Sequence, residues 1–260
     1  MFGIYVALFN RELLKQNRNR VSDKFLEADF IYQETAEIIT QTILDCKRNF
    51  ANALEIGARS GELGKKINVK NLIQTDLAIG FQPDLVMDDE HLCFKDQSFD
   101  LIISNLNLHF INDIPQNLIA IRKLLKPDGI FIASFFGEEN LKELKEVFLQ
   151  TEQKFYNGIS PRIAPNIDVK MAGMLLQKAG FADVVSEVHR MEVEYSNVKK
   201  LFEDLKNMGQ TNILNDRSRK FMTKNFLFDL TNLYQKLYCR EKNQYLATFE
   251  IIILTGWKKS

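Results

Sequence analysis

Carboxylates, amides and glycines that follow apolar runs are the residues best suited to chemistry in this 260-residue chain. The first such run, residues 53–56, carries Glu55 and breaks into a turn that holds Gly57 and Gly61. A turn of this kind lets the backbone approach a small polar ligand closely, because glycine has no Cβ to block it. Arg59 stands where a compact nucleotide-type turn carries another glycine. Its long side chain crowds that approach unless it points away from the ligand.

Acidic and amide side chains also follow the next three apolar runs. Asp76 ends the second run, Asp88 and Asp89 end the third, and Ser104 and Asn105 end the fourth. In an open parallel sheet these positions meet at one edge, where ligands bind. A carboxylate at the second strand end suits both ribose hydroxyls, an acid after the third suits an exocyclic amine, and an amide can hold an ammonium group. This chemistry predicts a nucleoside ligand that carries a cationic amino acid, although acids at strand ends also serve as helix caps.

Other polar residues have both a functional and a structural interpretation. His109 follows the fourth run closely enough to act as a base, but it also stands beside Phe110, and we favour a packed histidine. Arg162, in a proline-containing loop, can bind a carboxylate or phosphate or can be solvated. The chain also holds a basic cluster, made of Arg217, Arg219, Lys220 and Lys224. This cluster is compatible with an acidic partner or with an exposed helix face. The three histidines lack metal-binding spacing, so we expect no metal site.

Alternating strands and helices must bring these residues to a common edge. The apolar patterns predict buried strands over residues 51–56, 71–75, 85–87, 99–105 and 130–136. Helical periodicity predicts helices over 62–67 and 114–125, and one or two more over 21–46, where they are placed to cross the mouth of the site. A turn at 126–129, with Pro127 and Gly129, is expected to stop the 114–125 helix. The alternation indicates an α/β fold with a doubly wound, mainly parallel sheet.

The second half of the chain is less regular. We expect helices over residues 138–155 and 169–178, a loop over 160–166, a strand over 181–195 and a last strand over 247–256. Helices over 198–208 and 217–238 interrupt the last two strands and predict a lid or a partner-docking insertion. We therefore expect a single domain, 1–260, with an N-terminal helical segment (1–50), a core (51–196), a helical lid insertion (197–243) and a last strand (244–260).

Charge and hydropathy narrow the class of protein. Lys plus Arg and Asp plus Glu each number 34, so no net field attracts the chain to nucleic acid. The longest apolar runs fall far short of the roughly 20 residues that a membrane-spanning helix needs, and the first ten residues lack the pattern of a secretory signal. The cysteines have no short spacing, which favours a reducing compartment. Usage rich in Asn, Lys and Ile hints at a bacterial genome. We expect a globular, cytoplasmic protein of a bacterium.

These motifs resemble those of class I S-adenosylmethionine-dependent methyltransferases. The matching pieces are residues 54–61, Asp76, Asp88, residues 98–104 and the Leu-Lys-Pro-Asp-Gly segment 125–129. A closer resemblance, nearly end to end, is to the methyltransferase-like assembly factors of respiratory complex I and their bacterial relatives. It rests on segments 9–11, 108–115, 136–137, 160–161, 178–181, 203–209 and 256–258. A more distant resemblance is to the malonyl-carrier-protein methyltransferases of biotin synthesis.

The resemblance implies a seven-stranded Rossmann-like sheet with an antiparallel last strand, and S-adenosylmethionine as cofactor. The predicted cofactor-binding residues are Glu55, Gly57, Ala58, Gly61, Asp76, Leu77, Asp88, Asp89, Ser104 and Asn105. No catalytic residue follows from the resemblance, and His109 is the candidate base.

The resemblance also implies a protein or carrier-bound acceptor, with a complex I subunit as a partner. Hydroxylation of an arginine in that subunit is an alternative to methyl transfer. Arg59 and the short stretch 76–88 depart from the family pattern. A noncatalytic assembly factor with weakened cofactor binding is therefore a further alternative.

Overall fold

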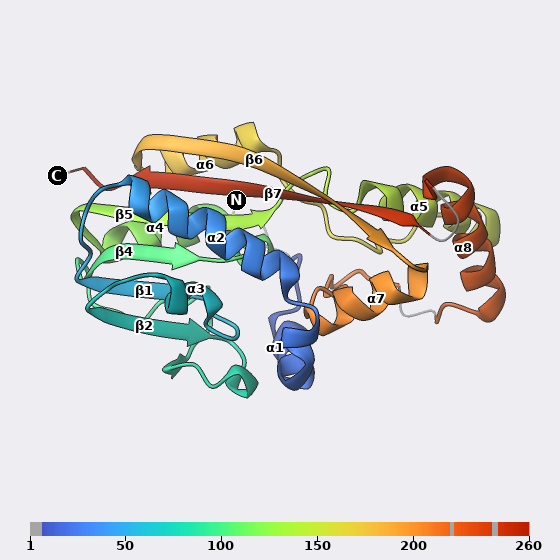
Figure 1. Ribbon diagram of the computed structural model, residues 1–260, viewed down its shortest axis with the longest axis horizontal. Coiled ribbons are helices and arrows are strands. Elements are labelled where there is room, and N and C mark those ends of the chain that lie inside the picture. Colours follow the sequence, from blue (N-terminus) through green and yellow to red (C-terminus); the bar gives the residue numbers. More distant parts are fainter. Residues whose placement is uncertain (1–6, 219–220, 241–243, 260) are drawn as a thin grey trace, which may run out of the picture.

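A seven-stranded mixed sheet forms the centre of the protein (Figure 1). The computed structural model describes residues 7–218, 221–240 and 244–259. The strand order is β3-β2-β1-β4-β5-β7-β6, and β7 is antiparallel to both of its neighbours. The strands are β1 (Asn52–Ile56), β2 (Asn71–Asp76), β3 (Leu85–Val86), β4 (Phe99–Ser104), β5 (Leu125–Phe136), β6 (Ala182–Tyr195) and β7 (Tyr245–Trp257). This topology confirms the predicted Rossmann-like sheet with an antiparallel last strand.

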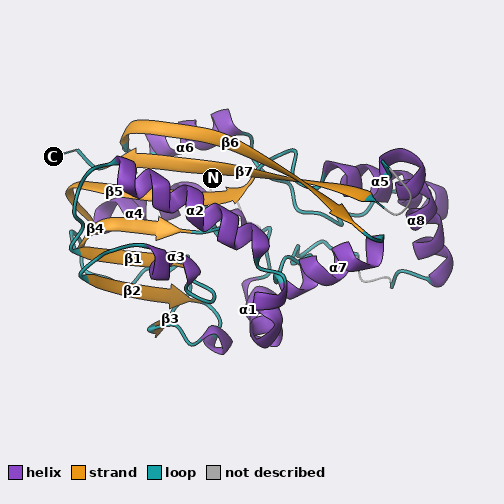
Figure 2. Ribbon diagram, viewed as in Figure 1, coloured by secondary structure: helices purple, strands orange, loops and turns teal. Residues whose placement is uncertain are grey.

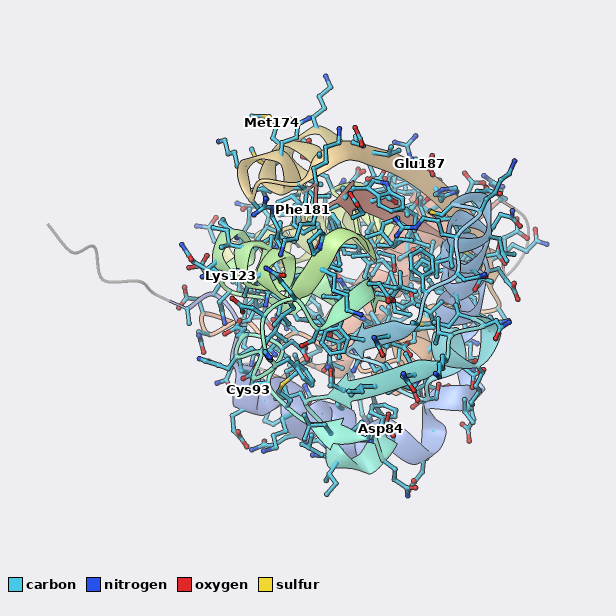
Figure 3. All side chains as sticks on the ribbon, turned by 90° about the vertical axis from the view of Figure 1, so that its left-hand side faces the viewer. Asp84, Cys93, Lys123, Met174, Phe181 and Glu187 are labelled. Carbon is cyan, nitrogen blue, oxygen red and sulfur yellow. The ribbon has the colours of Figure 1, made fainter. Side chains whose placement is uncertain are left out.

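Helices cover both faces of the sheet, as Figure 2 and the end-on view in Figure 3 show. One face carries α2 (Phe30–Asp45) and α3 (Glu62–Lys66), and the other carries α4 (Ile114–Leu124) and α6 (Val169–Lys178). Leu101 and Ile103 of β4 pack on the α2 side, and Ile102 between them packs on the α4 side. Because both faces are buried, the central strands read as continuous apolar runs.

The register of the parallel strands brings their carboxyl ends into line. Ile56 of β1 is paired with Thr75 of β2, and Asp76 is paired with Val86 of β3. On the other side of β1, Glu55 is paired with Ile103, so that Ser104 is level with Ile56. The loops that follow β1, β2, β3 and β4 therefore leave the sheet side by side, which is the arrangement that the candidate site requires.

An N-terminal helix, α1 (Arg11–Val21), is not predicted by the apolar pattern, which places the first helix at residue 21. Asn10 caps α1, because its side chain accepts a hydrogen bond from the amide of Leu13 at 2.8 Å. A 3₁₀ segment, η1 (Ser22–Glu27), joins α1 to α2. The prediction fails because the buried face of α1 includes the polar side chains of Asn17 and Arg18, which break the apolar periodicity.

The last two strands extend beyond the rest of the sheet and carry between them the helical insertion that was predicted as a lid, and we keep that name for it (Figure 1). β5 pairs with β7 only as far as Phe136, whereas β6 and β7 remain paired to Tyr195 and Tyr245. Beside this extension lie α5 (Lys142–Tyr156), α7 (Val198–Asn207) and α8 (Lys224–Tyr238). The insertion between the two strands is helical, as predicted.

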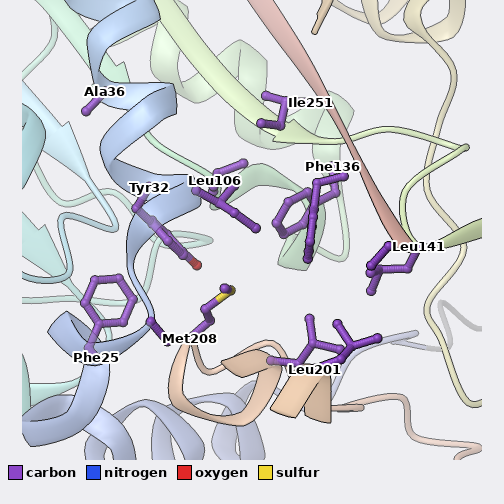
Figure 4. Close-up of a cluster of buried hydrophobic side chains, with 14 of the residues drawn as sticks. Phe25, Tyr32, Ala36, Leu106, Phe136, Leu141, Leu201, Met208 and Ile251 are labelled. Atoms are coloured by element: carbon purple, nitrogen blue, oxygen red, sulfur yellow. The ribbon is translucent and has the colours of Figure 1, made fainter. Parts of the chain in front are cut away.

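The lid packs onto the core through a shared apolar cluster. Figure 4 shows Leu201 of α7 and Met208, which follows it, in one cluster with Tyr32 of α2 and Phe136 of β5. All four side chains are buried. The lid is therefore held to the core by hydrophobic packing as well as by its strand connections.

Three predicted boundaries from residue 126 onward are wrong. The predicted turn at 126–129 lies within β5, where Asp128 has a φ of 58° and the register shifts against β4. The helix predicted from residue 138 begins only at Lys142, because Leu141 has a φ of 54°, which is not helical. The helix predicted from residue 217 begins at Lys224, where Thr223 caps it. Residues 219–220 of the basic cluster, Arg219 and Lys220, lie outside the described residues.

Candidate functional site

The turn after β1 has the backbone geometry of a close-approach turn. Gly57 and Gly61 both have a φ of 71°, a left-handed conformation that favours glycine. Arg59 has a φ of 52°, so the position where a further glycine was expected is also left-handed. A Cβ at Gly57 would lie 2.4 Å from the side chain of Asn107, which packs against the turn. The absence of a side chain at Gly57 thus allows a polar group from the β4 loop to lie on the backbone.

The Arg59 side chain leaves this turn toward α2 and the short segment η2 (Ile79–Phe81). Its guanidinium carbon lies 5.8 Å from the ring centroid of Tyr32 and 5.9 Å from that of Phe81. The preceding residue, Ala58, donates its amide to the carbonyl of Thr75 at 2.9 Å and so ties the turn to β2. The long side chain that the sequence places in the turn is therefore buried between two aromatic rings.

Asp76, at the end of β2, is fully buried and is surrounded by hydrogen-bond donors. Its Oδ1 accepts from the amide of Ala78 at 2.8 Å, and its Oδ2 accepts from the amide of Arg59 at 3.2 Å. The Nη1 of Arg18 lies 3.4 Å from Oδ1. The two backbone amides fix the orientation of the carboxylate between the turn after β1 and the loop after β2.

Arg18 is a buried site residue that the sequence analysis did not identify. It reaches from α1 into the site, is completely buried, and donates from Nη2 to Oδ1 of Asn107 at 2.5 Å. Burial and the neighbouring charge of Arg59 lower the pKa of Arg18 to about 10, so it remains a cation at neutral pH. A signal exists in the sequence, because a helix capped at Asn10 places Leu14 and Arg18 on one face.

Arg11, also on α1, binds the acids that follow β3. Its Nη2 lies 2.6 Å from Asp88 and 3.4 Å from Asp89. Burial alone would raise the pKa of Asp88, but Arg11 and a backbone amide outweigh burial and hold this pKa below its usual value. Burial raises the pKa of Asp89 despite Arg18 and Arg11 nearby. One oxygen of Asp89, Oδ1, has no hydrogen-bond partner within the described part of the chain, whereas Oδ2 accepts from Asn107 at 2.9 Å.

A small cavity of about 230 Å³ opens beside these acids. Between β2 and β3 the chain forms only the short η2 segment and no longer helix, as the length of this stretch predicts. The lining combines two predicted residues, Leu77 and Asp88, with neighbours from β3 and α1: Arg11, Glu12, Lys15, Val86 and Met87. The lining is mixed, because Leu77, Val86 and Met87 are apolar and the other four residues are charged. The carboxylate of Asp88 can accept a hydrogen bond from an amine-bearing ring system.

Three other predicted residues direct their side chains into the protein. Glu55 accepts a hydrogen bond from Nε2 of Gln74 at 2.7 Å beside α3, and burial raises its pKa to about 7. Ser104 donates to the carbonyl of the last residue of β1 at 2.9 Å. Asn105 donates to the carbonyl of Tyr32 at 3.0 Å. These side chains stabilise the strand ends, and a direct contact with a ligand stays a prediction for them.

A larger cavity, of about 410 Å³, lies between the ends of β4 and β5 and the lid. Its apolar lining includes Phe110, Phe136, Leu144, Phe148, Phe202 and Phe249. Arg162, Lys206 and Arg217 contribute positive charge, and the described residues of the lining include no Asp or Glu. Arg162 is partly neutralised, because its Nε donates to Glu152 at 2.6 Å while its Nη2 has no partner among the described residues.

His109 lies where the larger cavity approaches the acids at the strand ends. Its ring packs against Phe110 and Phe136, with centroid distances of 4.2 and 4.9 Å, in agreement with the packed-histidine interpretation. Its Nε2 lies 3.2 Å from Oε1 of Gln210, whose Nε2 donates to the hydroxyl of Tyr32 at 2.8 Å. Burial lowers the pKa of His109 to about 3, so the imidazole is neutral at physiological pH. Gln210 thus connects the cavity to Tyr32, whose ring lies beside the guanidinium of Arg59.

The polar clusters of the site do not include a metal-binding group. Within residues 7–218, 221–240 and 244–259, no three or more His, Cys, Asp or Glu side chains are grouped closely enough to hold a metal ion. None of the helices in these ranges is long and apolar enough to span a membrane.

Comparison with known proteins identifies relatives of this chain, and the matching regions include the strands that form the site. A family model described as a methyltransferase domain matches residues 54–133, from β1 to β5. The chain is 32% identical to the mitochondrial arginine-hydroxylase NDUFAF5 of Mus musculus, over 96% of this chain and 77% of that protein. It is 30% identical to malonyl-[acyl-carrier protein] O-methyltransferase 1 of Coxiella burnetii, over 76% of this chain and 71% of that protein. This chain belongs to the class I S-adenosylmethionine-dependent methyltransferase family. The solved structure of the YcgJ protein from Bacillus subtilis shares the fold, with a TM-score of 0.58 at 14% identity, and the match covers 87% of this chain and 99% of that one.

The methyltransferase cofactor fits this residue set at the base of its nucleoside. The unpaired Oδ1 of Asp89 is an acceptor that an exocyclic amine can satisfy, and the neighbouring Asp88 lines the small cavity together with Leu77, Val86 and Met87. The positions for the ribose and the amino acid are closed, because Arg18 pairs with Asp76 and Asn107 packs on Gly57. We therefore expect these two side chains to turn aside when S-adenosylmethionine binds.

Proposed function

We propose that this protein is an enzyme that transfers a methyl group from S-adenosylmethionine to an acceptor presented by a protein or a carrier. The observation that carries the proposal is that two sites meet at the carboxyl edge of the sheet. The acids after β2 and β3 lie on one side, and the 410 Å³ cavity lies on the other. The hydrogen bonds from His109 through Gln210 to Tyr32 join the two sites.

The lining of the large cavity indicates the class of acceptor. Its aromatic and aliphatic walls suit a substrate with an apolar body. Its charged residues are Arg162, Lys206 and Arg217, and the described lining offers no carboxylate. A cationic side chain would find no counter-charge there, whereas a neutral or anionic group would be accommodated. We therefore favour a carrier-bound or peptide acceptor whose reacting end is neutral or negatively charged.

Methyl transfer from S-adenosylmethionine requires little acid/base catalysis by the protein. When bound, S-adenosylmethionine supplies an electrophilic methyl group, and the acceptor must be held in line with it. His109 is a weak base, because burial lowers its pKa to about 3. Its ring is instead held by Phe110 and Gln210 at the boundary of the cavity. We assign it the role of a wall that positions the acceptor.

Two other functions are supported by specific observations. Hydroxylation of an arginine, in a complex I subunit, is favoured by the 32% identity to the mouse arginine-hydroxylase, while the cationic cavity lining opposes it. A noncatalytic assembly role is favoured by Arg18 and Asn107, which occupy the predicted ribose-binding acid and the glycine turn. The unpaired Oδ1 of Asp89 opposes that role, because a scaffold gains nothing from an unsatisfied buried acceptor.

A double-label assay separates the three functions. The purified protein is incubated with methyl-labelled S-adenosylmethionine, isotopically labelled dioxygen and a chemical reductant, because hydroxylation by dioxygen consumes two electrons. A malonyl-loaded carrier protein or an arginine-bearing complex I peptide is added as the acceptor. Mass spectrometry then reads both labels in each acceptor. The proposal predicts the methyl label, without the oxygen label, on the carrier-bound acceptor. An oxygen label on arginine would replace methyl transfer with hydroxylation, and no label on either acceptor would favour the assembly role.

A cavity-filling variant ties the transfer to the proposed acceptor site. Ala164 lines the large cavity, and Ala164→Trp places a large ring in it. We expect this variant to lose methyl transfer while its affinity for S-adenosylhomocysteine is unchanged. Met174→Trp is the matched control, because Met174 is 48% exposed on α6 (Figure 3) and lines neither of the two cavities. Full transfer by Ala164→Trp would show that the acceptor binds elsewhere.

A further inference from the structure

Arg59 differs from the other arginines of the cofactor site because it forms no ion pair with any residue that the structure describes. It is 3% exposed, and none of its three guanidinium nitrogens has a hydrogen-bond partner in the described part of the chain. Arg11, in contrast, lies 2.6 Å from Asp88, and Arg18 lies 3.4 Å from Asp76. Buried charges in proteins are normally paired, because removing an ion from water is costly. The missing partner of Arg59 therefore requires an explanation.

The surroundings of Arg59 hold its guanidinium without satisfying it. The rings of Tyr32 and Phe81 lie 5.8 and 5.9 Å away, at distances typical of cation–π contacts. Aromatic faces attract a cation, but they offer no lone pairs to its N–H groups. A planar fork of such donors matches a carboxylate, which can accept two parallel hydrogen bonds. The chemistry points to a carboxylate ligand.

The position of Arg59 in the cofactor site indicates which carboxylate of a ligand can reach its guanidinium. Its backbone forms the turn between Gly57 and Gly61, and its amide donates to Asp76, the predicted ribose-binding acid. Its guanidinium lies beside Tyr32 and Phe81, and a Cβ at Gly209, which follows α7, would lie 3.9 Å from its Nη1. The guanidinium therefore also borders the segment after α7. A nucleoside that carries an amino acid has its carboxylate at the end remote from the base, and a guanidinium that borders both the glycine turn and this segment is placed to meet it.

We infer that Arg59 binds the α-carboxylate of the cofactor's amino-acid tail and so selects carboxylated over decarboxylated nucleosides. The inference rests on the proposed function, because it requires S-adenosylmethionine as the ligand. It also changes the meaning of the departure from the family's glycine turn. The arginine that replaces a glycine supplies a binding group, and its left-handed backbone keeps the turn in place.

Calorimetry with two matched ligands tests the inference. S-adenosylhomocysteine and its decarboxylated analogue differ only in the carboxylate. We expect the wild-type protein to bind the first roughly 10- to 100-fold more tightly, the range that hydrogen bonds between charged groups provide. Arg59→Gln should remove this preference by weakening S-adenosylhomocysteine alone, and Arg59→Lys should retain part of it. Arg20→Gln, at an exposed arginine of α1, is the control and should keep the full preference.

The substitutions are compatible with the backbone of the turn. Gln82 and Gln97 already have φ values of 53° and 56° in this protein, close to the 52° of Arg59. Thermal unfolding shows whether each variant is folded. If Arg59→Gln does not fold, Arg59→Lys provides the test: its preference for S-adenosylhomocysteine over the decarboxylated analogue should be smaller than that of the wild type.

Two outcomes would overturn the inference, and they differ in what else they overturn. An unchanged preference in Arg59→Gln would show that the carboxylate of the cofactor is bound elsewhere, while nucleoside binding and the proposed function would stand. This is also the result expected if a carboxylate of the acceptor reaches Arg59 from the large cavity. Failure of the wild-type protein to bind either ligand would overturn the inference and the proposed function together.

Discussion

The guanidinium of Arg18 lies 3.4 Å from the carboxylate of Asp76, and both side chains are fully buried. The pair joins the N-terminal helix α1 to the end of β2, across 58 positions of sequence. The same Arg18 donates to Asn107, which packs against Gly57. The acid that is predicted to bind ribose is thus also the acid that anchors α1. Packing of α1 and binding of the cofactor are therefore coupled in this protein.

Arg18→Ala should destabilise the protein strongly. Removing one partner of a buried ion pair leaves the other charge uncompensated, which costs about 3 kcal/mol or more. Asp76 and Asp89 would both lose a neighbouring cation. Chemical denaturation measures the change in the free energy of unfolding. Arg20→Ala, at an exposed site on the same helix, is the control and should stay within about 0.5 kcal/mol of the wild type. Equal stability of the two variants would contradict a structural role for the pair.

Glu55 should make the protein less stable as the pH rises through neutrality. Burial raises the pKa of Glu55 to about 7 in the folded state, well above the value of about 4.3 for an exposed glutamate. Between these values the folded state binds more protons than the unfolded state, so stability falls with increasing pH. Glu55→Gln has no such proton to lose. Its stability relative to the wild type should increase by on the order of 3 kcal/mol between pH 4 and 8.

Urea denaturation at a series of pH values checks this expectation. The curves of wild type and Glu55→Gln should diverge as the pH rises. Glu34→Gln, at an exposed residue of α2, controls for the change in net charge. Parallel curves for the wild type and Glu55→Gln would show that Glu55 does not titrate near neutral pH.

His109 should remain neutral well into the acidic range. Burial lowers its pKa to about 3, so the folded state binds fewer protons than the unfolded state between that value and about 6.5. The stability that this provides is present above pH 6.5 and is lost as the pH falls through the window. NMR titration observes the ring directly, and the spectrum of His109→Gln assigns its signals.

The NMR signals of His109 should not move between pH 8 and about 5 in the folded protein. The same signals should titrate near pH 6.5 in urea, where the ring is exposed. A folded-state transition near pH 6.5 would mean that the ring is solvated and can act as a base. That result would return His109 to the list of catalytic candidates.

The sheet and its acids were predictable because they depend on local patterns. Continuous apolar runs that end in Asp76 and Asp88 are signals that one segment of sequence carries by itself. The alternation of these runs with helices sets the topology of a parallel sheet. The positions of Asp76 and Asp88 at one edge then follow from the register of the strands.

Arg18 and the large cavity could not be predicted in the same way. Arg18 is buried because acids at the ends of β2 and β3 lie next to it in space. Its charge interrupts the apolar periodicity from which the buried face of a helix is normally recognised. The cavity is formed where α5, α7 and the ends of β4 and β5 meet. Because its lining comes from segments far apart in the sequence, no local sequence pattern predicts this cavity. Arg59 was found from the sequence, but its lack of a partner is visible only in three dimensions.

Calorimetric titration with S-adenosylhomocysteine tests the central claim, that the carboxyl edge of this sheet binds the methyltransferase cofactor, most directly. We predict binding with one-to-one stoichiometry. Asp76→Asn should weaken it by roughly 10- to 100-fold through loss of the charged acceptor, and Asp96→Asn, at an exposed acid far from the site, should not. Absence of binding to the wild-type protein, or equal affinity of the wild type and Asp76→Asn, would contradict the account.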